Sequence, residues 1–223
     1  MLLTMKKDIR KNQTKRTVKM YNHIITWDVW RSRAINDFFW WVDEFFLAQE
    51  LFKQIPWDRA LKILEIPIGT GILTLDHYKN YTKLDITCCD YSPMMLNQAK
   101  ERASLLGLNQ ISFLEADVES LPFNNEVFDV ILCMNGLHVF RNKEKALWEF
   151  ARVLKTGGTF LGCNYIEWKN PKTDWLVQNI YLKKGFFALP SYTEIQLKKF
   201  LECYFSKVEL KSYKAQWLFM CKK

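Results

Sequence analysis

The sequence predicts an α/β fold in which a mostly parallel sheet is covered by helices on both faces. From residue 61 onward, short apolar runs alternate with segments of helical periodicity, which is the pattern of repeated strand–helix–strand units. The first run, KILEI at 62–66, is apolar at most positions, as expected for a parallel strand buried on both faces. A chain of 223 residues is long enough for one domain with a substantial core.

Seven strands are expected, with helices between them. They are predicted at 62–66, 84–89, 111–115, 127–134, 159–164, 207–213 and 216–221. After the second strand, Ser92 is a suitable helix N-cap and Pro93 suits the first helical position. Gly107 suits the position just past the end of that helix. A second helix is predicted at 143–154, ended by a Thr-Gly-Gly turn.

A basic arm begins the chain. Residues 1–19 hold seven Lys and Arg side chains against one Asp, a net charge of +6 out of +8, so the rest of the chain is nearly neutral. We interpret residues 1–20 as a solvated arm, and the alternative is contact with phosphates or anionic lipid. A nearly neutral body is not typical of a nucleic-acid-binding groove, so nucleic acid is disfavoured as a partner.

Residues 21–60 are predicted to form an aromatic-rich helical cap. They contain the run FFWWVDEFF, which is apolar around more than half of a helical wheel and should pack against the sheet or over its edge. Insertion into a membrane surface is the alternative, and it is disfavoured because Asp43 and Glu44 interrupt the run.

Cysteine spacing and hydropathy restrict the class of protein further. The six cysteines include no CxxC pair, so reduced thiols in the core are expected and a metal site is not. No apolar run approaches the roughly 20 residues of a transmembrane helix, and the first residues lack the pattern of a secretory signal. The expected location is the cytoplasm.

The loop at 67–71, PIGTG, follows the first strand directly. Gly69 and Gly71 can adopt a positive φ and let a ligand approach the bare backbone. Asp90 follows Gly71 by 19 positions at the end of the second strand, close to the spacing at which an acid reaches ribose hydroxyls. The third glycine of the dinucleotide-binding pattern is replaced by Thr74. The loop therefore predicts a nucleoside-containing cofactor without a pyrophosphate.

Four segments within residues 61–164 carry a family resemblance. They read LEIPIGTG, CCDYSPMMLNQAKERA, FLEADVESLPFNNEVFDVILCMNGLHVF and EFARVLKTGGTFLG, in this order. The chain thereby resembles the class I S-adenosylmethionine-dependent methyltransferases, in particular the branch of the ubiquinone and menaquinone C-methyltransferases. The resemblance implies a Rossmann-like, doubly wound core at 61–223 with a substrate-side insert at about 165–192. It also implies methyl transfer from S-adenosylmethionine to a small molecule. The aromatic residues before residue 60 and at 168–192 predict that this metabolite is apolar or aromatic, and the alternative is that they only pack in the core.

The resemblance also implies where the cofactor is bound. Glu65 and the loop backbone would surround its methionine part, Asp90 would bind the ribose, and Asp117 would accept from the adenine amino group. Asn135 would close the pocket near the sulfonium, and Tyr21 would cover the cofactor from the cap. The complete implied set is Tyr21, Glu65, Pro67, Gly69, Thr70, Gly71, Asp90, Tyr91, Met95, Asp117, Val118, Asn135 and Gly136.

Two positions depart from the family pattern. Pro67 stands where the family usually has the first glycine of the loop, and Thr156 stands where it usually has a proline before two glycines. Pro67 fixes φ and removes one amide donor, so it stiffens the loop. Cofactor binding is still expected because Gly69 and Gly71 are present.

The residues that would contact the methyl acceptor are less clearly indicated by the sequence. Trp27, Tyr165 and Trp168 are candidates to line it, and the alternative is that they only pack. His138 is the histidine next to the expected pocket and a candidate general base, which is needed only for an acceptor that arrives protonated. The alternative is a structural imidazole. Positioning alone can supply much of the rate enhancement in an in-line displacement.

Two other functions stay open. The chain could be an RNA or protein methyltransferase anchored by its basic arm, although CMNGLH after the fourth strand is not the Asn-Pro-Pro-Tyr type of motif. It could also be a cofactor-binding protein without catalytic activity.

Overall fold

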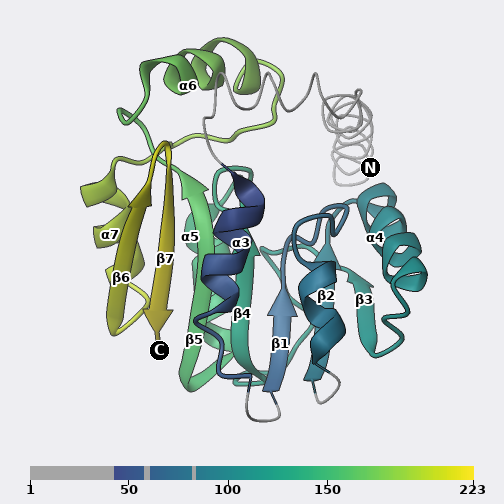
Figure 1. The fold of residues 1–223 in the computed structure, drawn as a ribbon. Helices are drawn as coiled ribbons and strands as arrows, with labels where there is room; N and C mark the ends of the chain where they lie inside the picture. The colour runs from purple at the N-terminus through teal and green to yellow at the C-terminus, as the bar shows by residue number, and fades with distance from the viewer. Residues whose placement is uncertain (1–42, 58–60, 82–83) are drawn as a thin grey trace, which may run out of the picture.

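A seven-stranded sheet forms the centre of the computed structural model, which describes residues 43–57, 61–81 and 84–223 (Figure 1). The strand order is β3-β2-β1-β4-β5-β7-β6. The strands are β1 Leu61–Glu65, β2 Leu84–Asp90, β3 Ile111–Glu115, β4 Phe128–Met134, β5 Leu154–Tyr165, β6 Lys207–Tyr213 and β7 Gln216–Lys222. Strands β1 to β5 pair in parallel and β7 pairs antiparallel with β5 and β6, which confirms the predicted fold class.

Helices cover both faces of this sheet. They are α3 Glu44–Phe52, α4 Pro93–Leu105, α5 Lys143–Val153, α6 Pro171–Leu176 and α7 Glu194–Glu202, with a 3-10 turn at Leu75–Asn80 and a π turn at Val177–Tyr181. Successive residues of a strand point to opposite faces. Ile63 accordingly packs with α3 and α4 in one core, and Leu64 packs with α5 and α7 in the other. Figure 1 shows α3 in front of the sheet and α5 and α7 behind it.

The helix ends predicted between β2 and β3 are present. The side chain of Ser92 accepts a hydrogen bond from the Met95 amide at 3.4 Å, Pro93 begins α4, and Gly107 has a φ of +71°.

The boundary between α5 and β5 differs from the prediction. The helix ends at Val153 and the strand begins at Leu154, so the Thr-Gly-Gly sequence lies inside β5 and not in a separate turn. The pairing register with β4 shifts between Phe128 and Val130, which accommodates the two glycines. Thr156 donates a 2.7 Å hydrogen bond to Glu126 there.

Residues between β5 and α7 leave the sheet and form a small unit with its own apolar cluster. Tyr165, Val177, Phe186 and Phe187 make up this cluster around α6 and the π turn. Figure 1 shows α6 beyond the end of the sheet to which the arrow of β5 points.

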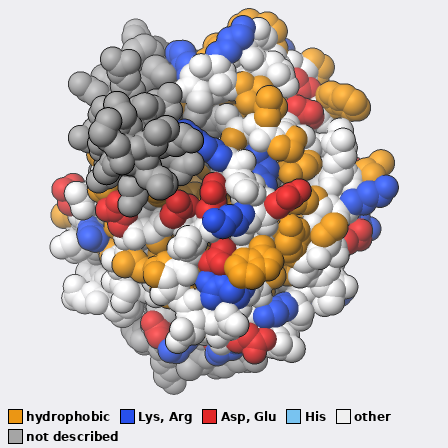
Figure 2. Space-filling model, turned by 180° about the vertical axis from the view of Figure 1, so that it is seen from behind, with side chains coloured by type: hydrophobic (Ala, Val, Ile, Leu, Met, Phe, Trp, Pro, Cys, Tyr) orange, Lys and Arg blue, Asp and Glu red, His pale blue; other side chains and the backbone are white. Residues whose placement is uncertain are grey.

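Several sequence-based expectations can be compared with this fold. All six cysteines are free thiols, and five are buried, as expected for reduced thiols in the core. The expectation is wrong for Cys203, which is exposed just past α7. Within the described ranges, no helix is long and apolar enough to cross a membrane, and no cluster of His, Cys, Asp and Glu is suited to a metal ion. The face seen in Figure 2 carries interspersed acidic and basic side chains without one continuous basic patch. Tyr21, Trp27, the arm and the cap before residue 43 lie outside the described residues.

Candidate functional site

The site lies where the strand order reverses, between β1 and β4, at the carboxyl ends of the parallel strands. Such a switch point is the usual ligand site in an open α/β sheet. The loop that follows β1 is attached to both neighbouring strands. The Ile66 amide donates to the Leu132 carbonyl of β4 at 3.0 Å, and the Ile68 amide donates to the Cys89 carbonyl of β2 at 2.9 Å.

Gly69 provides open backbone at this point. It has a φ of +57°, and a Cβ added to it would have no heavy atom within 4 Å. Its amide donates a 2.9 Å hydrogen bond to Oδ2 of Asp90. The space next to Gly69 and Asp90 is therefore of the kind that a nucleoside-containing cofactor requires, and these residues fit the predicted role.

Gly71 has a packing role that the sequence did not indicate. Its φ is +68°, but an added Cβ would lie 2.3 Å from Cδ1 of Leu75 and 3.5 Å from Cβ of Ala99. Its bare backbone therefore accommodates the Leu75 side chain at the position where a Cβ would lie. The absence of a Cβ at Gly71 is thus explained by packing, and the contact of Gly71 with the cofactor stays a prediction.

Asp90 connects the two loops that border the open space. Oδ2 accepts from Gly69 and Oδ1 accepts from the Ser92 amide at 2.8 Å. Burial raises the pKa of Asp90, while the backbone amides of Ser92, Gly69 and Tyr91 act in the opposite direction. A carboxylate has about four lone-pair positions, so Asp90 can keep both bonds and still accept from a diol.

Glu65 directs its carboxylate into the protein. Oε1 accepts from the Thr74 hydroxyl at 2.6 Å and Oε2 accepts from the Tyr78 hydroxyl at 2.8 Å. Burial raises its pKa to about 7. Glu65 thus holds the 3-10 turn onto β1, and its role near the methionine part stays a prediction.

The ends of β2 and β3 carry the side chains predicted to meet the adenosine. Tyr91 is 41% exposed, and Asp117 Oδ1 accepts a 2.9 Å hydrogen bond from the Glu119 amide. Met95 and Val118 are buried. In the loop after β1, the Thr70 carbonyl accepts a hydrogen bond from Nε of Arg102 at 3.3 Å. Because Ala116 donates to the Asp90 carbonyl at 3.1 Å, these strand ends lie at one edge of the sheet.

Two predicted residues follow β4. Asn135 has a φ of +54°, and its amide donates to the Cys163 carbonyl at 3.2 Å. A Cβ on Gly136 would lie 2.4 Å from Sγ of Cys133 and 2.6 Å from Cδ of Pro67. The Pro67 ring thus packs directly on the Gly136 backbone. Pro67, which departs from the family pattern, therefore has a packing role in this loop.

His138 is buried under the segment that follows β5. Its Nδ1 lies 3.0 Å from Oδ1 of Asn164, and its ring stacks on Phe187 with centroids 4.0 Å apart. Burial lowers its pKa to about 3. An imidazole with this pKa is neutral near pH 7 and a weak proton acceptor. These contacts support the structural alternative, and the catalytic role of His138 stays a prediction.

Tyr165 and Trp168 differ in their environment. Tyr165 is buried and its hydroxyl donates to the Asp174 carboxylate. Trp168 is 82% exposed, and its amide donates to Oδ2 of Asp174 at 3.1 Å. Asp174 therefore holds both residues in place, and their contact with an acceptor stays a prediction.

The comparison with known families decides the class of this fold. Residues 63–158 match the family model described as a methyltransferase domain. This segment includes the loop that contains Gly69, and it also includes Asp90 and Asn135. This segment is a class I methyltransferase domain. The family resemblance is thereby confirmed, and the cofactor of the family is S-adenosylmethionine, as expected.

Named relatives of this methyltransferase domain include quinone-modifying enzymes. The ubiquinone/menaquinone biosynthesis C-methyltransferase UbiE of Idiomarina loihiensis is 32% identical over 139 residues, which are 61% of this chain and 54% of that protein. The 2-methyl-6-phytyl-1,4-hydroquinone methyltransferase 1 of Oryza sativa subsp. japonica is 31% identical over 100 residues, 45% of this chain and 29% of that protein. The chain thus spans about half the length of the first relative and less of the second.

A solved structure supports the fold of the methyltransferase domain. The CurJ carbon methyltransferase superposes with a TM-score of 0.65 at 19% identity, covering 80% of this chain and 53% of that one.

Sequence reasoning missed one residue of this site. Oε1 of Glu44, in the first turn of α3, accepts a 3.1 Å hydrogen bond from Nδ2 of Asn135. The sequence signal was the acid that interrupts FFWWVDEFF, which indicated only that the run is not inserted in a membrane. Its partner is 91 positions away, and no local pattern reveals such a contact.

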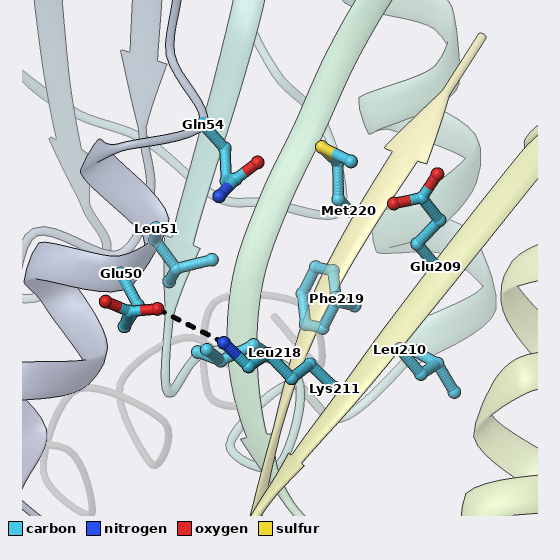
Figure 3. A pocket seen from close by; sticks show the side chains of 9 residues that line it. All are labelled: Glu50, Leu51, Gln54, Glu209, Leu210, Lys211, Leu218, Phe219 and Met220. Atoms are coloured by element: carbon cyan, nitrogen blue, oxygen red, sulfur yellow. Dashed lines mark hydrogen bonds and ion pairs between the residues drawn. The ribbon is translucent and has the colours of Figure 1, made fainter.

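A groove on the α3 face lies apart from these residues. It encloses about 180 Å³ between α3 and the β6–β7 hairpin, and Figure 3 shows its side chains. Leu51, Leu218 and Met220 contribute apolar side chains, and Glu50 pairs with Lys211 at 3.2 Å beside them. None of the predicted site residues lines this groove.

Proposed function

We propose that this chain transfers a methyl group from S-adenosylmethionine to a small apolar, aromatic acceptor by in-line displacement. The observation that carries the proposal is the open space at Gly69 beside Asp90, at the switch point of a methyltransferase domain. A bound S-adenosylmethionine supplies a methyl group that is already activated by a sulfonium. The protein therefore has mainly to hold the donor and acceptor in line.

The cofactor would be held by residues from three strand ends. The Gly69 backbone would border its methionine part, Asp90 would accept from the ribose hydroxyls, and Asp117 would accept from the adenine amino group. Tyr91 extends from the end of β2 and is partly exposed, so its ring is available to contact the nucleoside.

The acceptor class is supported by the relatives. Their names specify C-methylation in ubiquinone and menaquinone biosynthesis and methylation of a phytyl hydroquinone. We propose that the acceptor is a hydroquinone-type ring that is attacked through carbon. We also propose that the cap at 21–60 and the insert at 165–192 enclose it, and that the protein is cytoplasmic, in agreement with its six free thiols.

An experiment with labelled S-adenosylmethionine tests this function. The full chain is incubated with reduced 1,4-naphthohydroquinone, total RNA and a protein extract in separate reactions. Label in a methylated naphthohydroquinone supports the proposal. Label in RNA or protein alone supports the alternative in which the basic arm anchors a macromolecule. Binding of S-adenosylhomocysteine without any transfer supports a non-catalytic cofactor-binding protein.

A further inference from the structure

Hydrogen-bond acceptors gather where β4, β5 and β7 meet the start of α3. Glu44 accepts from Asn135, and the side chain of Gln216 also hydrogen-bonds Glu44. Gln216 is 1% exposed, and its Oε1 has no hydrogen-bond partner among the described residues. Buried polar atoms in proteins nearly always have a partner, so this oxygen needs an explanation.

The cluster complements a donor. A carboxylate can accept about four hydrogen bonds, and an amide oxygen can accept two. Asn135 and Gln216 already donate hydrogen bonds to Glu44. The oxygens of Glu44 and Gln216 can therefore accept further hydrogen bonds, and the cluster lacks a donor. A hydroxyl placed between Glu44 and Gln216 Oε1 would satisfy both.

The cluster lies at the edge of the sheet at which we place the cofactor. Asn135 directly follows β4, and the next residue, Gly136, packs on Pro67 of the loop that contains Gly69. Figure 1 shows the N-terminal end of α3 at the edge of the sheet to which the arrows of β4 and β5 point. Glu44 is therefore on the same edge as the cofactor loop.

The surroundings of Glu44 suit a proton acceptor. It forms none of the salt bridges found among the described residues, whereas Glu50 on the same helix pairs with Lys53 and Lys211. Its titratable neighbours are Asp43 and Cys163, and burial raises the pKa of Glu44. A carboxylate whose pKa is raised toward the working pH is a more effective general base.

We propose that Glu44 accepts the proton of a phenolic hydroxyl on the methyl acceptor and that Gln216 orients that hydroxyl. The inference rests on the proposed function. As the O–H bond breaks, the proton moves to the Glu44 carboxylate and the electron pair stays on oxygen. That pair increases electron density at the adjacent ring carbon. The ring carbon bonds to the methyl carbon while the bond from methyl to sulfur breaks and its electrons stay on sulfur. The ring proton then leaves to solvent, and Glu44 returns its proton to the oxygen.

A first test measures turnover with Glu44→Gln in the full chain. With 1,4-naphthohydroquinone under anaerobic conditions, turnover should fall by about 10²- to 10⁴-fold, the usual effect of losing a positioned base. The remaining rate should no longer increase with pH over the range in which Glu44 ionises. S-adenosylhomocysteine affinity should be unchanged. The matched control is Glu50→Gln on the same helix, which should keep the wild-type rate. Turnover of Glu44→Gln within threefold of wild type would overturn the proposal.

A second test does not depend on turnover. We compare binding of 1-naphthol and its methyl ether to the chain saturated with S-adenosylhomocysteine. The wild type should prefer 1-naphthol by about tenfold or more, because a site built around acceptors rejects a ligand without the donor. Gln216→Leu and Glu44→Leu should remove the preference. A wild type without this preference would overturn the proposal. If the preference is present but no hydroquinone is methylated, the proposed function fails and the hydroxyl site stands.

Discussion

The Gly69 amide donates a 2.9 Å hydrogen bond to the Asp90 carboxylate, and this bond joins the loop after β1 to the end of β2. The same carboxylate accepts from the Ser92 amide at the start of α4. One side chain therefore fixes both borders of the open space in which we place the cofactor.

Replacement of Asp90 should affect both binding and folding. Asp90→Ala should weaken S-adenosylhomocysteine binding by about 1.5–3 kcal/mol, the magnitude of hydrogen bonds to a charged group. Two backbone donors, the amides of Gly69 and Ser92, would also be left without their acceptor. We expect the free energy of unfolding to fall by about 1–3 kcal/mol. Calorimetry and urea unfolding measure the two effects, and unchanged binding would assign the ribose to another residue.

The two loop glycines should respond differently to the same substitution. Gly71→Ala introduces a Cβ into Leu75 at a positive φ and should lower the free energy of unfolding by about 2–4 kcal/mol. Gly69→Ala meets no atom and should cost about 1–2 kcal/mol from backbone strain, while it reduces cofactor affinity. Urea unfolding of both variants tests this pair. Equal destabilisation would contradict the packing role of Gly71.

Stability should depend on pH through Glu65. Its pKa is about 7 in the folded chain against 4.5 for an ordinary Glu, so the folded state binds the additional proton between these values. The wild type should therefore lose stability relative to Glu65→Gln as pH rises from about 4.5 to 7, by at most about 3 kcal/mol. Urea unfolding of both proteins at pH 5 and pH 7.5 gives the difference. A difference that stays constant with pH would show that Glu65 titrates normally.

Loss of His138 should have a small kinetic effect. His138→Ala should reduce turnover by less than tenfold and leave the shape of the pH–rate profile unchanged, because a pKa of about 3 does not suit a base near pH 7. The loss of stacking on Phe187 should instead loosen the segment after β5 and speed its cleavage by protease. A loss of turnover of 10²-fold or more would restore the catalytic interpretation of His138.

Local patterns were sufficient for most of the fold. Alternating strand and helix periods predicted all seven strands in the described part of the chain, and the Ser92 cap was predicted because a cap depends on neighbouring residues. The predicted start of β5 was wrong because a Thr-Gly-Gly sequence is equally compatible with a turn and with a bulge inside a strand. Only pairing with β4 distinguishes the two.

The site was predictable where function depends on backbone and less so where it depends on distant contacts. Spacing alone predicted that Gly69 and Asp90 border one site, and a 2.9 Å hydrogen bond joins them; their contact with a cofactor stays a prediction. The packing of Gly71 against Leu75 and the bond between Asn135 and Glu44 depend on how elements meet, which no local sequence pattern specifies.

The single exposed thiol allows the protein to be labelled at one position. Cys203, just past α7, is exposed, while the other five cysteines are buried and burial raises the pKa of each. Because the thiolate is the reactive form, a maleimide dye at neutral pH should label Cys203 first and the remaining five only as the protein opens. The unmodified chain therefore provides a single attachment point for a fluorophore, and slow labelling of the other thiols would report opening of the sheet.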